Sequence, residues 1–477
     1  MQNGRILSFA AFNKYLREAM PPLCTGQSSV AAISNFSTAF LRVLGGILLA
    51  AGVIFTGSAY ATATNCPIAA QGIYNVCTFA TAGAGTGASP WTGWEGRLNE
   101  LPANIEIYFT TGTYQQNTTL VAKKGWTLRG AGMGATTIIA GSTFTGDMIQ
   151  WGSALTINSS VAAYLTIKDM GLHSPSANAR SAAINIVGGT YVNIKNVLTA
   201  GFGIGLVLNQ AEIVDVEDCD FEGSSSASVA GIYLVNGNYN PSNSNINTSA
   251  AKTGSTNRIS IQKNQFNGGN SNFIGVYDEG GYVHSIRDNN FNAGARAVYL
   301  AGVHQGLIEG NEIEGTQADP IYIDQIMPNE QWSINTYETQ SHDLSIRHNS
   351  MAMMGVNKSS VLFATPSSGY SDPFVWVASV TDNALGSVNS SSVPSLSGVS
   401  HVAGLVAYSN FNGYGGTPIS DVGSVTSEIH GTISISTSHA INDPTNPPKG
   451  TFYLYVDTDN VLKAKGANGT VTTLAIP

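Results

Sequence analysis

One short pattern recurs along the middle of the chain: an apolar residue, two variable residues, Asn, one variable residue and a second apolar residue. Each copy follows a stretch in which β-branched residues alternate with other residues, as in a strand. Such recurrence indicates stacked structural repeats, which constrains the fold more than any other feature. The five copies are Ile261–Phe266, Ile286–Phe291, Ile308–Ile313, Ile346–Met351 and Val380–Leu385.

Three weaker copies precede these five, and their Asn position holds Met170, Val197 and Cys219. The spacings between successive positions are 27, 22, 45, 25, 22, 38 and 34 residues. The spacing of 45 fits either two coils or one coil with a large insertion, whereas 38 and 34 fit single coils with long loops.

A period of 22 to 27 residues with three short strands in each repeat predicts an all-β fold, a parallel β-helix. Each coil can bury its inward side chains only against the coils above and below it. We expect about eight to ten coils between Ile105 and Ser409. Asn suits its position because it tolerates the left-handed conformation of a tight turn, and because stacked amides can hydrogen-bond between coils.

Charge is scarce in this chain. Charged residues make up 11% of the 477 residues, and the formal net charge is −9. Binding to nucleic acid requires clustered Lys and Arg, so nucleic acid is not expected as a partner.

The N-terminal region contains an apolar run, Val43–Phe55, behind Arg42, and Ala59 and Ala61 follow it. This run is shorter than the ~20 residues that span a bilayer, so we expect a signal peptide that is cleaved after Ala61. The alternative is an uncleaved anchor. Cleavage would make the protein secreted or cell-surface, with no membrane contact afterwards.

Export makes a disulfide between Cys66 and Cys77 plausible, and the alternative is two unpaired small residues. Cys219 is expected to be buried inside a repeat.

The entry to the repeats resembles the first coils of the pectate-lyase-like superfamily. The resemblance rests on Ile105–Tyr114 (with its Gly-Thr-Tyr turn) and Trp126–Ile138, and it implies a right-handed parallel β-helix. Trp94–Leu101 would form the helix that caps its open end. That superfamily includes pectate lyases, polygalacturonases and phage tailspikes, but the polygalacturonase catalytic signatures are missing, so no specific reaction is implied.

The C-terminal segment differs from the repeats. Pro447–Lys463 predicts a β-hairpin that turns at Asp459 and Asn460, and Gly466–Leu474 predicts a further strand. It is similar to segments of phage tail-fibre-like proteins, which are often trimeric, so a homotrimer is a possibility. The expected parts are a leader and signal peptide (1–61), an N-terminal segment and cap (62–104), the β-helix (105–410), a linker (411–446) and the C-terminal β segment (447–477).

Tyrosines recur on the strand that precedes each Asn turn. Strand alternation places Ile232, Ile274, Val298 and Ile321 inward and the tyrosines outward, where sugar rings could stack on them. The alternative is that Tyr is simply favoured in half-buried strands. The expected sugar-binding residues are Tyr233, Tyr277, Tyr299, Tyr322 and, in the long insertion 325–341, Trp332.

Carboxylates end two of these strands. Asp278 or Glu279 would act as the acid and Asp324 as the base of an inverting glycosidase, about two coils apart. The alternative is that they are solvated strand-end carboxylates. No metal ligands or cofactor are assigned, although a lyase would use Ca²⁺ held on a uronate.

The sequence therefore predicts an exported, carbohydrate-active β-helix, a lyase or a hydrolase, with an acidic or capsular polysaccharide as its partner. The alternatives are a non-catalytic glycan-binding surface or tail-fibre-like protein, and a purely structural rod.

Overall fold

The computed structural model describes residue 66 and the ranges 71–152, 164–175, 181–223, 227–235, 256–325, 340–355, 357–365, 374–385, 396–408, 411–412, 452–456 and 461–475. Within these ranges, no helix has the length and apolar character needed to cross a membrane.

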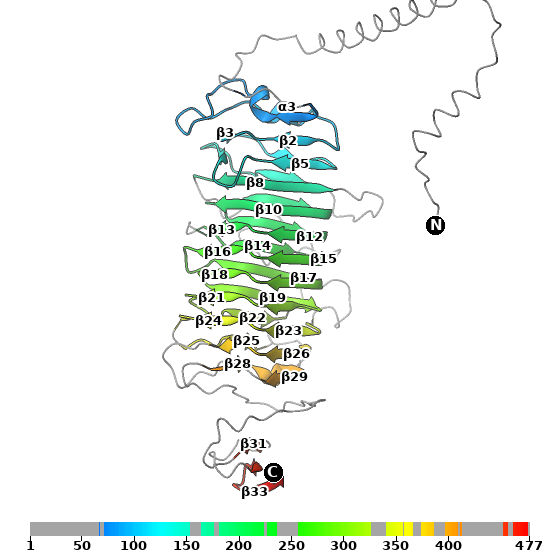
Figure 1. The fold of residues 1–477 in the computed structure, drawn as a ribbon, viewed down its shortest axis with the longest axis vertical. Coiled ribbons are helices and arrows are strands. Elements are labelled where there is room, and N and C mark those ends of the chain that lie inside the picture. The colour runs from blue at the N-terminus through cyan, green and yellow to red at the C-terminus, as the bar shows by residue number, and fades with distance from the viewer. Residues whose placement is uncertain are drawn as a thin grey trace, which may run out of the picture. The chain divides into compact units, whose positions relative to one another are not determined.

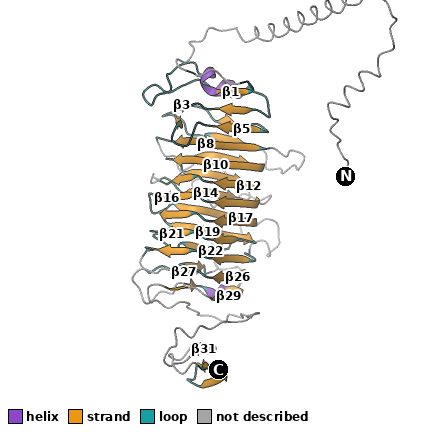
Figure 2. Cartoon of the chain, viewed as in Figure 1, coloured by secondary structure: helices purple, strands orange, loops and turns teal. Residues whose placement is uncertain are grey.

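The β-helix is one continuous 30-stranded sheet that winds around a buried core, and its strands pair in parallel with those of the next coil. Figures 1 and 2 show these strands stacked along one axis. Three strand directions per coil give the solenoid three faces, which we call the tyrosine face, the charge face and the third face. The predicted fold, a right-handed parallel β-helix with a cap helix and a small C-terminal β segment, is confirmed.

The tyrosine face carries the strands expected to bind sugar. It consists of β4 (Leu120–Val121), β7 (Ile149–Trp151), β9 (Ala182–Val187), β11 (Ile204–Asn209), β14 (Ala230–Val235), the first half of β17 (Ile274–Arg287), β19 (Arg296–His304), β22 (Ile321–Asp324), β25 (Val361–Phe363) and β28 (Leu396–Ser397).

The charge face follows the tyrosine face along the chain in each coil. It consists of β1 (Ile73–Asn75), β2 (Glu106–Tyr108), β5 (Trp126–Arg129), the first halves of β8 (Leu165–His173) and β10 (Thr190–Ala200), β12 (Glu212–Glu217), β15 (Thr256–Gln262), the second half of β17, β20 (Leu307–Glu309), β23 (Leu344–Arg347), β26 (Val375–Thr381) and β29 (Val402–Tyr408).

The third face completes each coil after the Asn turn. It consists of β3 (Gly112–Gln116), β6 (Thr136–Ala140), the second halves of β8 and β10, β13 (Asp220–Glu222), β16 (Gln265–Gly268), β18 (Asn290–Ala293), β21 (Glu312–Glu314), β24 (Ser350–Ala352), β27 (Ala384–Leu385) and β30 (Phe411–Asn412).

The repeated asparagines form a buried ladder at the corner between the charge face and the third face. The Nδ2 group of each of the first four donates to Oδ1 of the asparagine in the next coil, at 2.9–3.0 Å, and all five Nδ2 groups donate to a backbone carbonyl. Asn311 Oδ1 also accepts from the backbone N–H of Asn289, at 3.0 Å. The ladder contains Asn264, Asn289, Asn311, Asn349 and Asn383.

The left-handed conformation expected of these asparagines belongs instead to the residue before each one. Lys263, Asp288 and His348 have φ of 54–56°, and Asp382 has φ of 55°. The turn thus relies on the preceding residue for its backbone shape, which leaves each asparagine side chain free to point inward.

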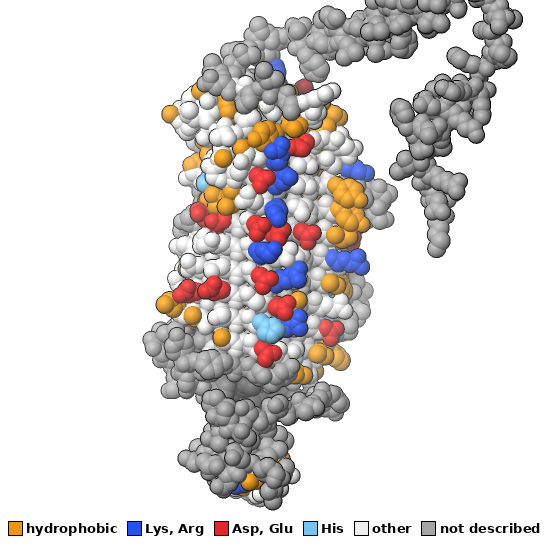
Figure 3. Space-filling model, viewed as in Figure 1, with side chains coloured by type: hydrophobic (Ala, Val, Ile, Leu, Met, Phe, Trp, Pro, Cys, Tyr) orange, Lys and Arg blue, Asp and Glu red, His pale blue; other side chains and the backbone are white. Residues whose placement is uncertain are grey.

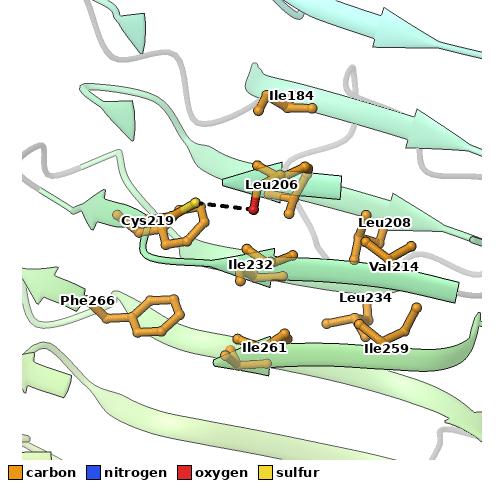
Figure 4. Close-up of a cluster of buried hydrophobic side chains, with 14 of the residues drawn as sticks. Ile184, Leu206, Leu208, Val214, Cys219, Ile232, Leu234, Ile259, Ile261 and Phe266 are labelled. Atoms are coloured by element: carbon orange, nitrogen blue, oxygen red, sulfur yellow. Dashed lines mark hydrogen bonds between the residues drawn. The ribbon is translucent and has the colours of Figure 1, made fainter. Parts of the chain in front are cut away.

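The core consists of files in which the same inward position is apolar in successive coils. Figure 4 shows two such files, one containing Ile184, Leu206 and Ile232, the other Val214 and Ile259. Phenylalanines stack similarly, with ring centroids 5.1 Å apart for Phe221 and Phe266 and 4.6 Å apart for Phe266 and Phe291.

Glycines on the tyrosine face lie beneath this phenylalanine stack. A Cβ added to Gly231 would lie 2.7 Å from Phe266 Cδ1, and one added to Gly275 would lie 2.5 Å from Phe291 Cδ1. Gly275 therefore faces the core, contrary to the expected alternation. Val276 is the inward neighbour of Ile232, and Ile274 lies on the outer side with a second apolar cluster.

The spacing of 45 residues corresponds to one coil with an insertion. Strands β12 and β13 pair directly with β15 and β16, so Cys219 and Asn264 occupy adjacent coils. The inserted residues, 236–255, lie outside the described residues.

The N-terminal end is closed by a short helix, α3 (Glu95–Leu98), and by aromatic packing around the buried Trp94. The parallel sheet begins earlier than residue 105, because β1 pairs with β2. After β1 comes the 3-10 helix η1 (Val76–Phe79), and η5 (Val399–His401) precedes β29. Cys66 and Cys77 are joined by a disulfide with their Cα atoms 5.6 Å apart, and Cys219 is a free, buried thiol.

The C-terminal residues form a separate antiparallel sheet. It contains β31 (Phe452–Val456), β32 (Leu462–Gly466) and β33 (Val471–Ala475), with β32 in the centre. This matches the predicted hairpin and further strand. The leader (1–61), the turn residues Asp459 and Asn460 and nearly all of the linker lie outside the described residues.

The asparagine ladder generates a stability prediction. Replacing Asn311 with Ala removes four hydrogen bonds and leaves buried donors of Asn289 without an acceptor. Because each buried polar group that loses its hydrogen-bond partner costs about 1–3 kcal/mol, we expect a loss of about 3 kcal/mol or more in local unfolding free energy. Amide hydrogen exchange of the neighbouring coils measures it. The exposed Asn292→Ala is the control, and an equal effect there would contradict the prediction.

Candidate functional site

Four tyrosines form a file on the outer side of the tyrosine face. Tyr233, Tyr277, Tyr299 and Tyr322 occupy equivalent positions in successive coils. Their ring centroids are 5.2, 4.5 and 5.1 Å apart along the file. Arg296 ends the stack, since its guanidinium carbon lies 3.8 Å from the ring centroid of Tyr322.

This file is not the open platform that the sequence predicts. Tyr233 is fully buried and Tyr277 is 5% exposed, and both belong to the second apolar cluster, with Ile204 and Val207. Only Tyr299 and Tyr322 are half-buried rather than buried. Only the Tyr299–Tyr322 end of this file is therefore accessible from the surface.

Two carboxylates follow the tyrosines in a second outward file. Glu279 is in register with Ala301, which is in register with Asp324, so the two carboxylates are two coils apart. Tyr233 donates its hydroxyl proton to Glu279 Oε2 at 2.9 Å, and Tyr299 donates to Asp324 Oδ2 at 2.6 Å. Burial and the Asp324 carboxylate raise the pKa of Tyr299 far above its usual value, so this hydroxyl remains a donor.

Asp278 does not belong to this carboxylate file. Its side chain points into the interior, where it is fully buried and lies 2.6 Å from His284 Nδ1. It occupies an inward position because strand residues alternate, and Glu279 takes the outward one. Of the two residues expected as the acid, only Glu279 therefore shares a file with Asp324, and Asp278 points away from it.

A third file, missed by the sequence analysis, lies across the corner from the carboxylates. It contains Tyr282, His304, His342 and Trp376, which are in register or in ring contact from coil to coil. The side chain of Trp376 is 50% exposed, and its indole N–H donates to Gln340 Oε1. Tyr282 and His304 each come three residues after a carboxylate-file position, a recurrence that could have revealed them.

Burial of the His304 imidazole and, to a smaller extent, the neighbouring His342 lower its pKa to about 4. The imidazole is therefore neutral at neutral pH. It can accept or donate a hydrogen bond there without adding charge.

Trp332, the remaining expected sugar-binding residue, lies outside the described residues, as does most of the 325–341 insertion. Among the residues that the structure describes, no group of three or more His, Cys, Asp or Glu side chains could hold a metal ion.

A stripe of alternating charge runs along the charge face (Figure 3). Glu217 lies 2.8 Å from both Lys195 and Lys263, and Arg347 lies 2.8 Å from Glu309. These pairs are largely solvent-exposed, so they add little stability. The stripe lies on a different face from the carboxylate file.

No protein-family model matches the sequence, and no curated protein matches it. Several solved structures are similar to it. The surface adhesin PfbA of Streptococcus pneumoniae is 13% identical with a TM-score of 0.50, covering 72% of this chain and 98% of the adhesin. DFA-IIIase of Arthrobacter chlorophenolicus A6 is 11% identical with a TM-score of 0.47, covering 75% of this chain and 92% of the enzyme.

A GH87 α-1,3-glucanase of Streptomyces thermodiastaticus is 12% identical with a TM-score of 0.40, covering 73% of this chain and 69% of the glucanase. At 13% identity and a TM-score of 0.50, the likeness to PfbA concerns the fold alone.

The lowered pKa of His304 makes stability depend on pH. Between the unfolded pKa near 6.5 and the folded pKa of about 4, the unfolded chain binds a proton that the folded protein does not, so stability falls as pH falls through this window. At about 1.4 kcal/mol per pKa unit, the loss is roughly 2–3 kcal/mol by pH 4.5.

Urea denaturation at pH 7 and pH 4.5 measures this loss. The variant His304→Gln should show a smaller difference between the two pH values than the unmodified protein. His348→Gln is the control, because His348 is exposed. An unchanged difference in His304→Gln would contradict the assignment.

Proposed function

We propose that the protein acts on a glycan at the corner between the tyrosine face and the charge face. One observation carries this proposal: Glu279 and Asp324 share an outward file two coils apart, with aromatic files on both sides. This combination of paired carboxylates and flanking aromatic rings suits a sugar chain.

The spacing of the carboxylates favours inverting hydrolysis. At ~4.8 Å between neighbouring coils, two coils correspond to roughly 10 Å, close to the upper end of the range in which a water molecule fits between acid and base. Glu279 would protonate the leaving oxygen, and Asp324 would activate the water. The small side chain of Ala301 lies between them in the file.

The sugar chain would run along the solenoid axis. Tyr299 and Tyr322 would contact it on one side of the corner, and the exposed ring of Trp376 would contact it one coil beyond Asp324. Trp332 remains a proposed contact. The parallel packing of Trp376 on His342, at an interplanar angle of 9°, fixes one face of the indole and leaves the other for a sugar ring.

The charges at this corner favour a neutral or amino sugar over the acidic polysaccharide expected from the sequence. Glu279 and Asp324 are both acidic, and the nearby cation, Arg296, is already paired with Asp319 at 3.4 Å. A uronate carboxylate would be repelled here. A Ca²⁺-dependent lyase acting on uronates is less well supported for the same reason.

A glycan-binding protein without catalysis is the second candidate. Glu279 is only 3% exposed and Tyr277 only 5%, so access to the acid is restricted. The adhesin PfbA, a surface protein by its description, has the same fold. Export is part of both proposals, and the leader pattern and the Cys66–Cys77 disulfide support it. A homotrimer stays a proposal that rests on the C-terminal segment.

The catalytic proposal predicts the effect of removing each carboxylate. Glu279→Gln and Asp324→Asn should each lower the release of reducing ends by at least about 100-fold, since each removes a proton-transfer group. The assay uses neutral, amino-sugar and uronate polysaccharides. The exposed Glu312→Gln is the control. Binding without turnover would favour the second candidate, and full turnover by Asp324→Asn would refute the carboxylate assignment.

The contact with Trp376 can be tested separately. Trp376→Ala should weaken oligosaccharide binding about fivefold, because aromatic stacking of this kind contributes about 1 kcal/mol, whereas Trp376→Phe should retain most of it. Isothermal titration measures the affinities. Tyr164→Ala, at an exposed aromatic residue many coils away, should leave affinity unchanged; an equal loss there would contradict a specific site.

A further inference from the structure

We propose that a buried network of Asp278, His284 and Thr256 inside the β-helix positions Glu279 for its role at the corner. This inference rests on the proposed function. The three residues do not reach the surface, since Asp278 and Thr256 are fully buried and His284 is 3% exposed. They are therefore positioning residues, without contact with a glycan.

The network replaces apolar side chains in the core. Asp278 lies in register between Leu234 and Leu300, and His284 is in register with Ile259. All of these neighbours belong to the apolar core cluster. One coil thus carries polar groups where adjacent coils carry aliphatic ones.

The hydrogen bonds of the network connect Asp278, through His284 and Thr256, to the backbone of Gly280 at the corner. Asp278 Oδ2 lies 2.6 Å from His284 Nδ1, and His284 Nε2 lies 3.1 Å from Thr256 Oγ1. Thr256 Oγ1 also donates to the carbonyl oxygen of Gly280 at 3.2 Å. Residues 278 and 280 are therefore both tethered, and Glu279 lies between them.

The corner itself is shaped to fit this network. Gly280 has a φ of 75°, in the left-handed region, where it lets the chain turn from the tyrosine face to the charge face. A Cβ on Gly281 would overlap the His284 ring and would lie 2.5 Å from Thr256 Oγ1. Gly281 thus provides the space that the network occupies.

Stability alone does not account for these residues. A buried charged or polar pair is often no more stabilising than well-packed apolar side chains of similar volume. Asp278 Oδ1 adds to the cost, because it is buried with no hydrogen-bond partner among the described residues. A role in holding the adjacent Glu279 explains why polar groups stand in this coil.

The pair of variants Thr256→Val and Thr256→Ser tests the proposal. Val removes the hydroxyl with little change in shape, whereas Ser keeps it. In Thr256→Val we expect the amides of Glu279, Gly280 and Gly281 to exchange at least tenfold faster, and kcat to fall about tenfold with KM unchanged. Thr256→Ser should behave like the unmodified protein on both measures.

The double variant Asp278→Leu/His284→Leu covers the case in which Thr256→Val folds poorly. It should fold as stably as the unmodified protein and should show the same loss in kcat. Unchanged amide exchange in Thr256→Val, or full kcat in a stable double variant, would overturn the proposal. If the unmodified protein cleaves no glycan, the proposed catalytic function fails, while amide exchange still decides whether the network holds the corner.

Discussion

In the described coils, inward side chains pack against the same position in neighbouring coils, and the rest of the structure depends on that constraint. The asparagines stack from coil to coil through hydrogen bonds, and the files of Ile, Leu, Val and Phe stack through apolar packing. Because each coil contacts only its neighbours, an insertion or an unusual residue in one coil leaves the distant coils unchanged. The insertion between β14 and β15 leaves the pairing of β12 with β15 intact, and the polar pair Asp278 and His284 lies inside one coil between apolar neighbours.

The parts of the fold that follow from this constraint could be predicted from the sequence. The Asn positions and the parallel β-helix were recoverable because repetition exposes them. The phase of β17 could not be predicted, since both Ile274 and Val276 are β-branched; the register of Val276 with Ile232 and the close approach of Gly275 to Phe291 place Val276 toward the core. The left-handed backbone conformation was predicted for Asn289 but is adopted by Asp288, one position earlier, because both residue types suit a turn.

The candidate site was predicted only in part, for a related physical reason. Glu279 and Asp324 could be paired because they end equivalent strands, but a charged residue such as Asp278 is ordinarily assigned to the surface. Its burial is explained by its hydrogen bond to His284, which comes later in the same strand, β17, and which contacts Thr256 on β15 of the adjacent coil. The file of His342 and Trp376 escaped notice because insertions of different length separate its members in sequence. A site assembled from adjacent coils can therefore be recognised only when the strand register between those coils is known.

The rings of Phe221, Phe266 and Phe291 lie over glycines in the same way from coil to coil, which has an evolutionary consequence. Neither the glycine nor the phenylalanine of such a pair can be substituted alone. A larger residue in place of the glycine would overlap the ring, and a smaller residue in place of the phenylalanine would leave a cavity. Compensating exchanges across the two strands are the permitted route of change. In a set of homologues these positions would therefore vary together, and that covariation would mark the coil boundaries even where the asparagines have been lost.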